Sequence, residues 1–133
     1  MWFGIWRYSW MKLLFPRLVW NVPNDSNVYL TFDDGPHPQN TPRLLDMLRE
    51  RNIRATFYVV GRNVDLYPHI VRRIVAEGHE IGNHTWTHRN LTRLSNASVR
   101  SEMDRTRDVI VSACGVQPRT MRPPYGALRE SQR

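Results

Sequence analysis

The chain has 133 residues, 41% of them hydrophobic and 23% charged, which is enough for one domain or part of one. Its single cysteine, Cys114, excludes an internal disulfide and a cysteine-based metal site, and we expect it to fill space on a helix. The formal net charge of +7 comes almost entirely from arginines that are scattered along the chain. This pattern indicates a solvated surface and does not favour nucleic acid as a partner.

Residues 1–27 form an aromatic-rich segment. Trp2, Trp6 and Trp10 recur every four residues, as on one face of a helix. Charged side chains interrupt the apolar run, so it falls short of the ~18 residues of a membrane span, and it lacks the features of a signal peptide. We expect this segment to pack on the domain, and contact with a membrane surface is the less favoured alternative. Cytoplasmic and cell-envelope locations both stay open, and nothing in the sequence indicates an oligomeric state.

Strands and helices alternate along residues 28–133. Four short β-branched, aromatic or apolar runs predict strands, at residues 28–32, 55–60, 79–82 and 119–121. Three amphipathic stretches predict helices, at residues 41–52, 68–78 and 95–115. Because no hairpin signal separates the strands, the order predicts an α/β fold with a parallel sheet or barrel.

Polar clusters follow three of these strands. Asp33 and Asp34 come after the first strand, the stretch His84–His88 after the third, and Arg122–Tyr125 after the fourth. In parallel α/β folds the carboxyl ends of the strands meet at one edge, and functional residues gather there. We therefore expect the three clusters to lie together.

The residue types in these clusters indicate a metal site. His84 and His88 would share one face of a helical turn, and two neutral nitrogens with one carboxylate oxygen make a zinc-type site that keeps an open position. Successive residues of an extended chain point in opposite directions, so one aspartate would bind the ion and the other would act as a base. Arg122 is the expected cation beside the base, and amides at Tyr125 and Gly126 could stabilise an oxyanion.

The motifs TFDDGP, HTWTH and RPPYG, in this order, resemble those of the polysaccharide deacetylase family, the NodB-homology domain of chitin and peptidoglycan deacetylases. The resemblance covers about residues 28–128 and implies that residues 28–133 are the N-terminal part of a distorted (β/α) barrel. It further implies hydrolysis of an N-acetyl, or sometimes an O-acetyl, group on a polysaccharide substrate. The roles that it implies are metal binding for Asp34, His84 and His88, with zinc as the usual ion and cobalt or a similar ion as the alternative. Asp33 would be the base, Arg122 would position it, and the main chain at Tyr125 would help to hold the oxyanion.

Two further motifs of the family, an Asp-Trp segment and a Leu-x-His whose histidine is the general acid, are absent after Gly126. The chain thus resembles a C-terminally truncated member, and we expect the 133-residue polypeptide to bind metal but to deacetylate slowly or not at all. His37, His69 and His79 are expected to be a loop residue, a solvated helix residue and a packing residue.

Three other interpretations stay open from the sequence. The first is a non-catalytic carbohydrate-binding remnant of the family that would use an exposed Trp86. The second is a nucleic-acid binder, suggested only by the pI of about 10.5. The third is a metal phosphoesterase, which would also use aspartates and histidines.

Overall fold

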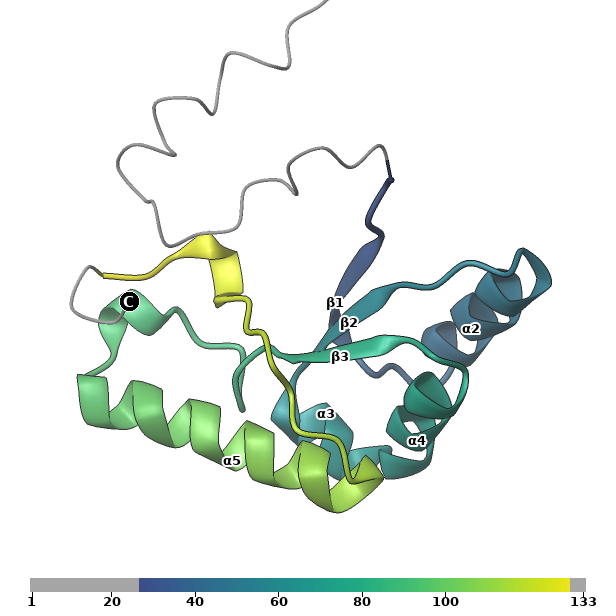
Figure 1. Ribbon diagram of the computed structural model, residues 1–133. Helices are drawn as coiled ribbons and strands as arrows, with labels where there is room; N and C mark the ends of the chain where they lie inside the picture. The colour runs from purple at the N-terminus through teal and green to yellow at the C-terminus, as the bar shows by residue number, and fades with distance from the viewer. Residues whose placement is uncertain (1–26, 130–133) are drawn as a thin grey trace, which may run out of the picture.

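The computed structural model describes residues 27–129 and shows a small parallel sheet with helices packed against it (Figure 1). Its strands are β1 (Thr31–Gly35), β2 (Thr56–Val59) and β3 (Glu80–Asn83), in the spatial order β1-β2-β3. Both strand pairs are parallel, which confirms the predicted α/β class. The prediction that the aromatic-rich N-terminal segment packs on the domain lies outside the described residues.

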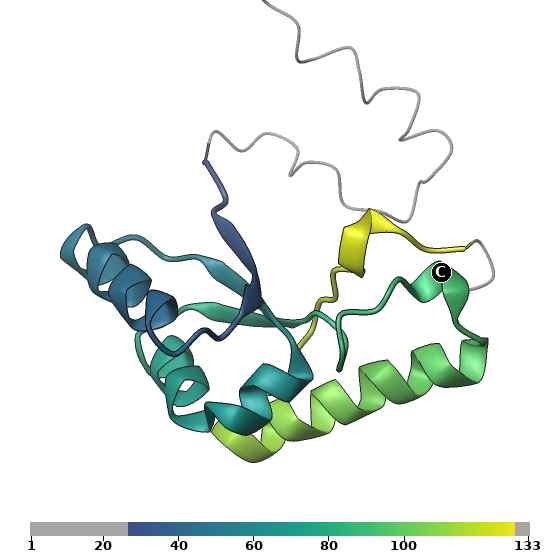
Figure 2. The same cartoon turned by 180° about the vertical axis from the view of Figure 1, so that it is seen from behind.

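Four α-helices and two short 3₁₀ helices connect and follow the strands. They are α2 (Asn40–Glu50), α3 (Gly61–Leu66), α4 (Pro68–Ala76), η2 (Leu91–Arg93), α5 (Asn96–Cys114) and η3 (Pro124–Gly126). Figures 1 and 2 show α3, α4 and α5 together on one side of the sheet. Among the described residues, no helix is long and apolar enough to cross a membrane.

The core lies between this side of the sheet and the helices. Phe57, Val59 and Ile81 point into it from the strands, and each is at most 6% exposed. They meet side chains such as Ile74 and Ile110, which are fully buried. The alternate strand residues, including Thr56 and Tyr58, face the other way and keep partial exposure, as a strand periodicity of two requires.

Local sequence signals explain three helix termini, the start and end of α5 and the start of α4. The Ser95 side chain accepts a hydrogen bond from the amide of Ser98 and so caps the start of α5. Gly115 ends the same helix with φ 73°, the left-handed conformation that favours glycine. Pro68 is the first residue of α4, where a missing amide hydrogen costs nothing.

The predicted first strand, 28–32, was wrong in its bounds. β1 begins at Thr31, and Val28 and Tyr29 are 85% and 63% exposed. The partner strand β2 begins only at Thr56, opposite Thr31, so the residues that precede Thr31 run past the end of their neighbour. The predicted fourth strand is reduced to one parallel bridge, between Asn83 and Met121.

The sequence pattern predicts a strand at residues 55–60 and no helix directly after it, so helix α3 was missed. Gly61 is the first residue of α3. A Cβ atom there would lie 2.5 Å from Cε3 of Trp86 and 2.7 Å from Oγ1 of Thr106. This glycine therefore allows a loop and α5 to approach α3 closely.

The start of α2 also differs from the prediction. The helix begins at Asn40, and Gln39 occupies the N-cap position without a side-chain capping hydrogen bond. Thr41, the predicted first residue, is buried inside the first turn and accepts a hydrogen bond from the amide of His37. His37 Nδ1 in turn accepts hydrogen bonds from the amides of Gln39 and Asn40, both at 3.2 Å. His37 is thus a loop residue that also helps to satisfy the free amides of the first helical turn.

Candidate active site and metal centre

Asp34, His84 and His88 meet at the carboxyl end of the sheet. The Oδ1 atom of Asp34 lies 3.3 Å from Nε2 of His84 and 3.1 Å from Nε2 of His88. One ligand atom from each side chain fits within 4.8 Å of the other two. His84 is almost fully buried, whereas the Asp34 side chain is 69% exposed, so the group is anchored on one side and open to solvent on the other.

The backbone of β1 separates the two adjacent carboxylates. The register with β2 shifts between Phe32 and Gly35, and Asp34 adopts φ 68°, a left-handed conformation that aspartate tolerates better than most residues. As a result, Asp33 points to Arg122 while Asp34 points to the two histidines. The two carboxylates therefore diverge for two reasons: neighbouring strand residues alternate in direction, and the backbone is irregular at this point.

The helical turn predicted for HTWTH is wrong. Residues 84–88 form a loop in which Thr85 has φ 67° and His88 has φ 55°, and these two left-handed residues bring the imidazole rings to a centroid distance of 5.0 Å. The amide of Gly61 donates to the carbonyl of Thr85 at 2.9 Å. The amide and hydroxyl of Thr87 both donate to the carboxylate of Glu102 on α5, at 2.7 and 2.8 Å.

The hydrogen bonding of His84 suits a metal ligand. Nδ1 of this ring lies 2.7 Å from the carbonyl oxygen of Arg122. A carbonyl can only accept, so Nδ1 carries the proton and Nε2 is left with a lone pair that faces Asp34. This is how protein structures commonly orient a metal-binding histidine, and the donor set of two imidazoles and one carboxylate fits zinc or a similar divalent ion.

The side chain of Arg122 lies at the second carboxylate. Its NH1 group donates to Oδ1 of Asp33 at 2.8 Å and to Oγ1 of Thr31 at 2.8 Å. The guanidinium also lies over the ring of Tyr58, 4.2 Å from its centroid. Arg122 therefore serves both halves of the site, with its carbonyl on His84 and its guanidinium on Asp33.

Tyr125 lies beside the candidate metal-binding group. Its side chain is 72% exposed, its ring lies 5.1 Å from the ring of His88, and its backbone has φ 61°. The amide of Gly126 donates to the carbonyl of Pro123 at 3.0 Å, so of the two amides considered from the sequence, that of Tyr125 is the better candidate for an oxyanion donor.

Several supporting residues escaped the sequence reasoning. Thr31, Tyr58 and Glu102 hold the site residues in place. Thr31 opens the TFDDGP motif but carries no group that would indicate a catalytic role, and Tyr58 and Glu102 lie outside the three motifs. Trp86, predicted to be exposed, is half-buried, and its ring is covered by the guanidinium of Arg105 at 4.1 Å. One face of the indole is therefore covered by a guanidinium, which reduces the aromatic surface that the carbohydrate-binding interpretation uses.

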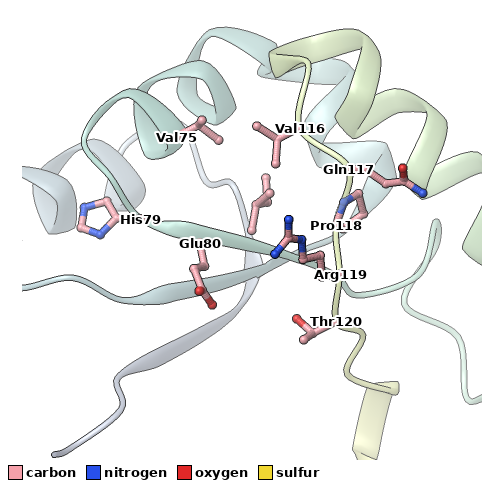
Figure 3. Close-up of a pocket in the computed structure, with 9 residues that line it drawn as sticks. Val75, His79, Glu80, Val116, Gln117, Pro118, Arg119 and Thr120 are labelled. Atoms are coloured by element: carbon pink, nitrogen blue, oxygen red, sulfur yellow. The ribbon is translucent and has the colours of Figure 1, made fainter.

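A separate cavity of about 820 Å³ lies away from this site, beside the amino end of β3 (Figure 3). Figure 3 shows the segment from Val116 to Thr120 running along one side of it, with Glu80 on the strand. His79 also lines it; the ring is buried as predicted, its Nδ1 accepts from the amide of Ala55 at 3.2 Å, and burial lowers its pKa. His69, on α4, is exposed, as predicted.

Comparison with known proteins places this site in a family. The family model described as polysaccharide deacetylase matches residues 21–133. The chain is 43% identical over 109 residues to a peptidoglycan-N-acetylglucosamine deacetylase of Bacillus cereus, which covers 82% of this chain and 40% of that protein. It is 49% identical over 107 residues to a chitooligosaccharide deacetylase of Bradyrhizobium, which covers 80% of this chain and 49% of the relative.

Comparison with solved structures leads to the same family. The peptidoglycan deacetylase PdaC of Bacillus subtilis superposes with a TM-score of 0.79 at 41% identity, over 84% of this chain and 55% of that one. The chain therefore spans about half the length of the proteins that it matches. With its three motifs on a parallel sheet and a family match over residues 21–133, the chain belongs to the polysaccharide deacetylase family.

Proposed function

We propose that this chain carries the metal-binding and base-bearing part of a hydrolase that removes acetyl groups from a polysaccharide such as peptidoglycan or a chitin-like glycan. The observation that supports this most strongly is the division of the adjacent carboxylates. Asp34 faces two histidine nitrogens, whereas Asp33 faces a guanidinium. N-acetyl groups are the proposed substrates and O-acetyl groups the alternative.

The residues divide the work between holding a metal and moving a proton. Asp34, His84 and His88 would hold zinc or a similar divalent ion, which when bound polarises a carbonyl group and lowers the pKa of water. Asp33 would take a proton from the attacking water, and NH1 of Arg122 keeps its Oδ1 in place. The amide of Tyr125 would donate to the oxygen on which negative charge develops.

No histidine of this chain is left to serve as the acid for the leaving nitrogen. His84 and His88 face Asp34, and His37 accepts hydrogen bonds from the amides of Gln39 and Asn40 at the start of α2. His69 is exposed on α4, and His79 is buried beside the other cavity. We therefore expect the 133-residue polypeptide to bind metal and acetylated glycan but to release acetate slowly.

The test is zinc-dependent binding of an acetylated glycan by the purified chain. We expect N-acetylchitotetraose to bind when zinc is present, to bind much more weakly after chelation, and to bind better than its fully deacetylated counterpart. Affinity that survives chelation, with no acetate release, would favour a non-catalytic carbohydrate-binding protein. Zinc-dependent hydrolysis of a phosphodiester, without glycan binding, would contradict the proposal and support the phosphoesterase interpretation.

The rate of acetate release is measured separately, with enzyme in excess over glycan. We expect slow release that Asp33→Asn lowers further. Fast release that Asp33→Asn abolishes would keep the deacetylase assignment and contradict the expectation of slow turnover.

A further inference from the structure

A second cavity, of about 530 Å³, borders the metal-binding group. It is lined by His88, Arg89, Asn90, Arg93 and Tyr125. His88 is shared between this cavity and the candidate metal centre, so a molecule in the cavity would lie next to the group on which the acetyl chemistry is proposed. Nothing in the motifs assigns a role to Arg89 or Arg93.

The lining of this cavity is cationic and rich in hydrogen-bond donors. No acidic side chain lines it, and within residues 27–129 neither Arg89 nor Arg93 takes part in an ion pair. Other arginines do so: Arg73 binds Asp46 and Arg107 binds Asp104. Two arginines that line one cavity and have no carboxylate partner among the described residues are suited to bind a planar anion.

Asn90, which lies between the two arginines in the sequence, adds a further hydrogen-bond donor to the cavity. The Oδ1 atom of Asn90 already accepts hydrogen bonds from the amide and the hydroxyl of Thr92, at 3.0 and 2.7 Å. These bonds fix the start of η2 and use the acceptor of Asn90, so its NH₂ group, a donor, is what it can offer to a ligand. The cavity therefore combines donors with positive charge.

Tyr125 supplies the remaining wall. Its ring packs edge-on against His88, at 5.1 Å between centroids, and 72% of the residue stays exposed. An exposed aromatic ring beside polar donors is a surface on which an apolar face of a sugar ring can rest while its substituents reach the charged groups. The metal centre, the aromatic ring and the two guanidinium groups are thus neighbours.

We propose that this cavity binds a carboxylate-bearing sugar next to the sugar whose acetyl group reaches the metal centre. The inference rests on the proposed deacetylase function and narrows its substrate. It favours a glycan in which acetylated sugars alternate with sugars that carry a free carboxylate, such as peptide-free muramic acid, over neutral chitin. Arg89 and Arg93 are then specificity-determining residues that act through charge.

The test compares matched glycans on the zinc-loaded chain by calorimetry. The ligands are a peptide-free tetrasaccharide of alternating N-acetylglucosamine and N-acetylmuramic acid, the same molecule with its carboxylates methyl-esterified, and N-acetylchitotetraose. We expect the acid to bind about tenfold or more tightly than the ester at low salt, and salt to reduce the difference. The double substitution Arg89→Gln/Arg93→Gln is expected to remove this preference and to leave chitotetraose affinity unchanged.

Two controls keep the result interpretable. Arg43→Gln removes one positive charge, half of what the double substitution removes, from an exposed position on α2 and should keep the preference. A zinc titration of the double variant should give the wild-type affinity, which shows that His88 is undisturbed.

Equal affinity of the wild type for acid and ester, or a preference that persists in the double variant, would overturn the subsite and leave the deacetylase proposal standing. If the zinc-loaded chain bound none of the three glycans, both proposals would fail.

Discussion

Replacing Gly61 by alanine should disturb the metal site from a distance. Gly61 starts α3, and its missing side chain leaves room for Trp86 of the HTWTH loop and for Thr106 of α5. Besides Cε3 of Trp86 and Oγ1 of Thr106, the backbone Cα of Thr106 would lie only 3.2 Å from the new Cβ. The methyl group cannot move toward α5, so it must push the indole of Trp86 away.

The size of the effect follows from these contacts. The new Cβ would lie 2.5 Å from Cε3 of Trp86, roughly 1 Å closer than the ~3.5 Å of an ordinary carbon–carbon contact. Over-packing of this kind costs about 1–3 kcal/mol, and the gain from a stiffer unfolded chain offsets about 0.4–1 kcal/mol. We expect Gly61→Ala to lower the free energy of unfolding by about 1–2 kcal/mol, which at about 4–8 °C for each kcal/mol lowers Tm by about 4–16 °C.

Urea unfolding and zinc calorimetry measure the two consequences. Because Trp86 lies between His84 and His88 in the chain, its displacement should weaken zinc binding by about tenfold. Gly35→Ala, whose new Cβ would meet only Oγ1 of Thr41 at 3.7 Å, is the control for stability. If Gly61→Ala unfolded at the wild-type urea concentration and bound zinc equally well, Trp86 would not be the wedge that positions this loop.

Three other substitutions test separate parts of the account. Glu102→Leu removes both acceptors of Thr87 and leaves its amide without this partner, so urea unfolding should show a loss of about 1–3 kcal/mol, and an unchanged midpoint would contradict the role of Glu102 as a loop clamp. Arg122→Lys should lower the free energy of unfolding by only about 0.5–1 kcal/mol, because the ion pair with Asp33 is partly exposed. Calorimetry should show unchanged zinc affinity, because the backbone carbonyl of residue 122, which orients His84, is kept. Burial lowers the pKa of His79, so the unfolded state binds a proton first as the pH falls below about 6.5, and the free energy of unfolding should drop there. In urea titrations from pH 7 to 5, His79→Gln should make the free energy of unfolding depend less on pH. An unchanged pH dependence in this variant would refute the role of His79.

Helix ends could be predicted because they depend on neighbours in the sequence. Ser95 begins α5 with a side-chain cap, and Gly115 ends it in a left-handed conformation. Both signals depend only on residues nearby in the sequence. Helix α3 could not be found in this way. Its first residue, Gly61, is a glycine because of Trp86 and Thr106, which are distant in the chain.

At the candidate site, the sequence indicated the chemistry but not the backbone geometry. The residue types of Asp34, His84 and His88 indicated metal binding, and the structure brings these side chains together. Spacing alone suggested a helical turn, but left-handed backbone at Thr85 and His88 produces the approach. Neither residue is a glycine, so the sequence carries no signal for these conformations; hydrogen bonds from α3 and α5 impose them.

The division of labour between the adjacent carboxylates is the central claim, and zinc calorimetry on three proteins tests it most directly. The wild type should bind one zinc ion. Asp34→Asn should lose more than about 100-fold in affinity because a ligand is removed, whereas Asp33→Asn should stay within about threefold because Asp33 faces Arg122. Equal losses in both variants, or a larger loss for Asp33→Asn, would contradict the assignment of Asp34 as ligand and Asp33 as base.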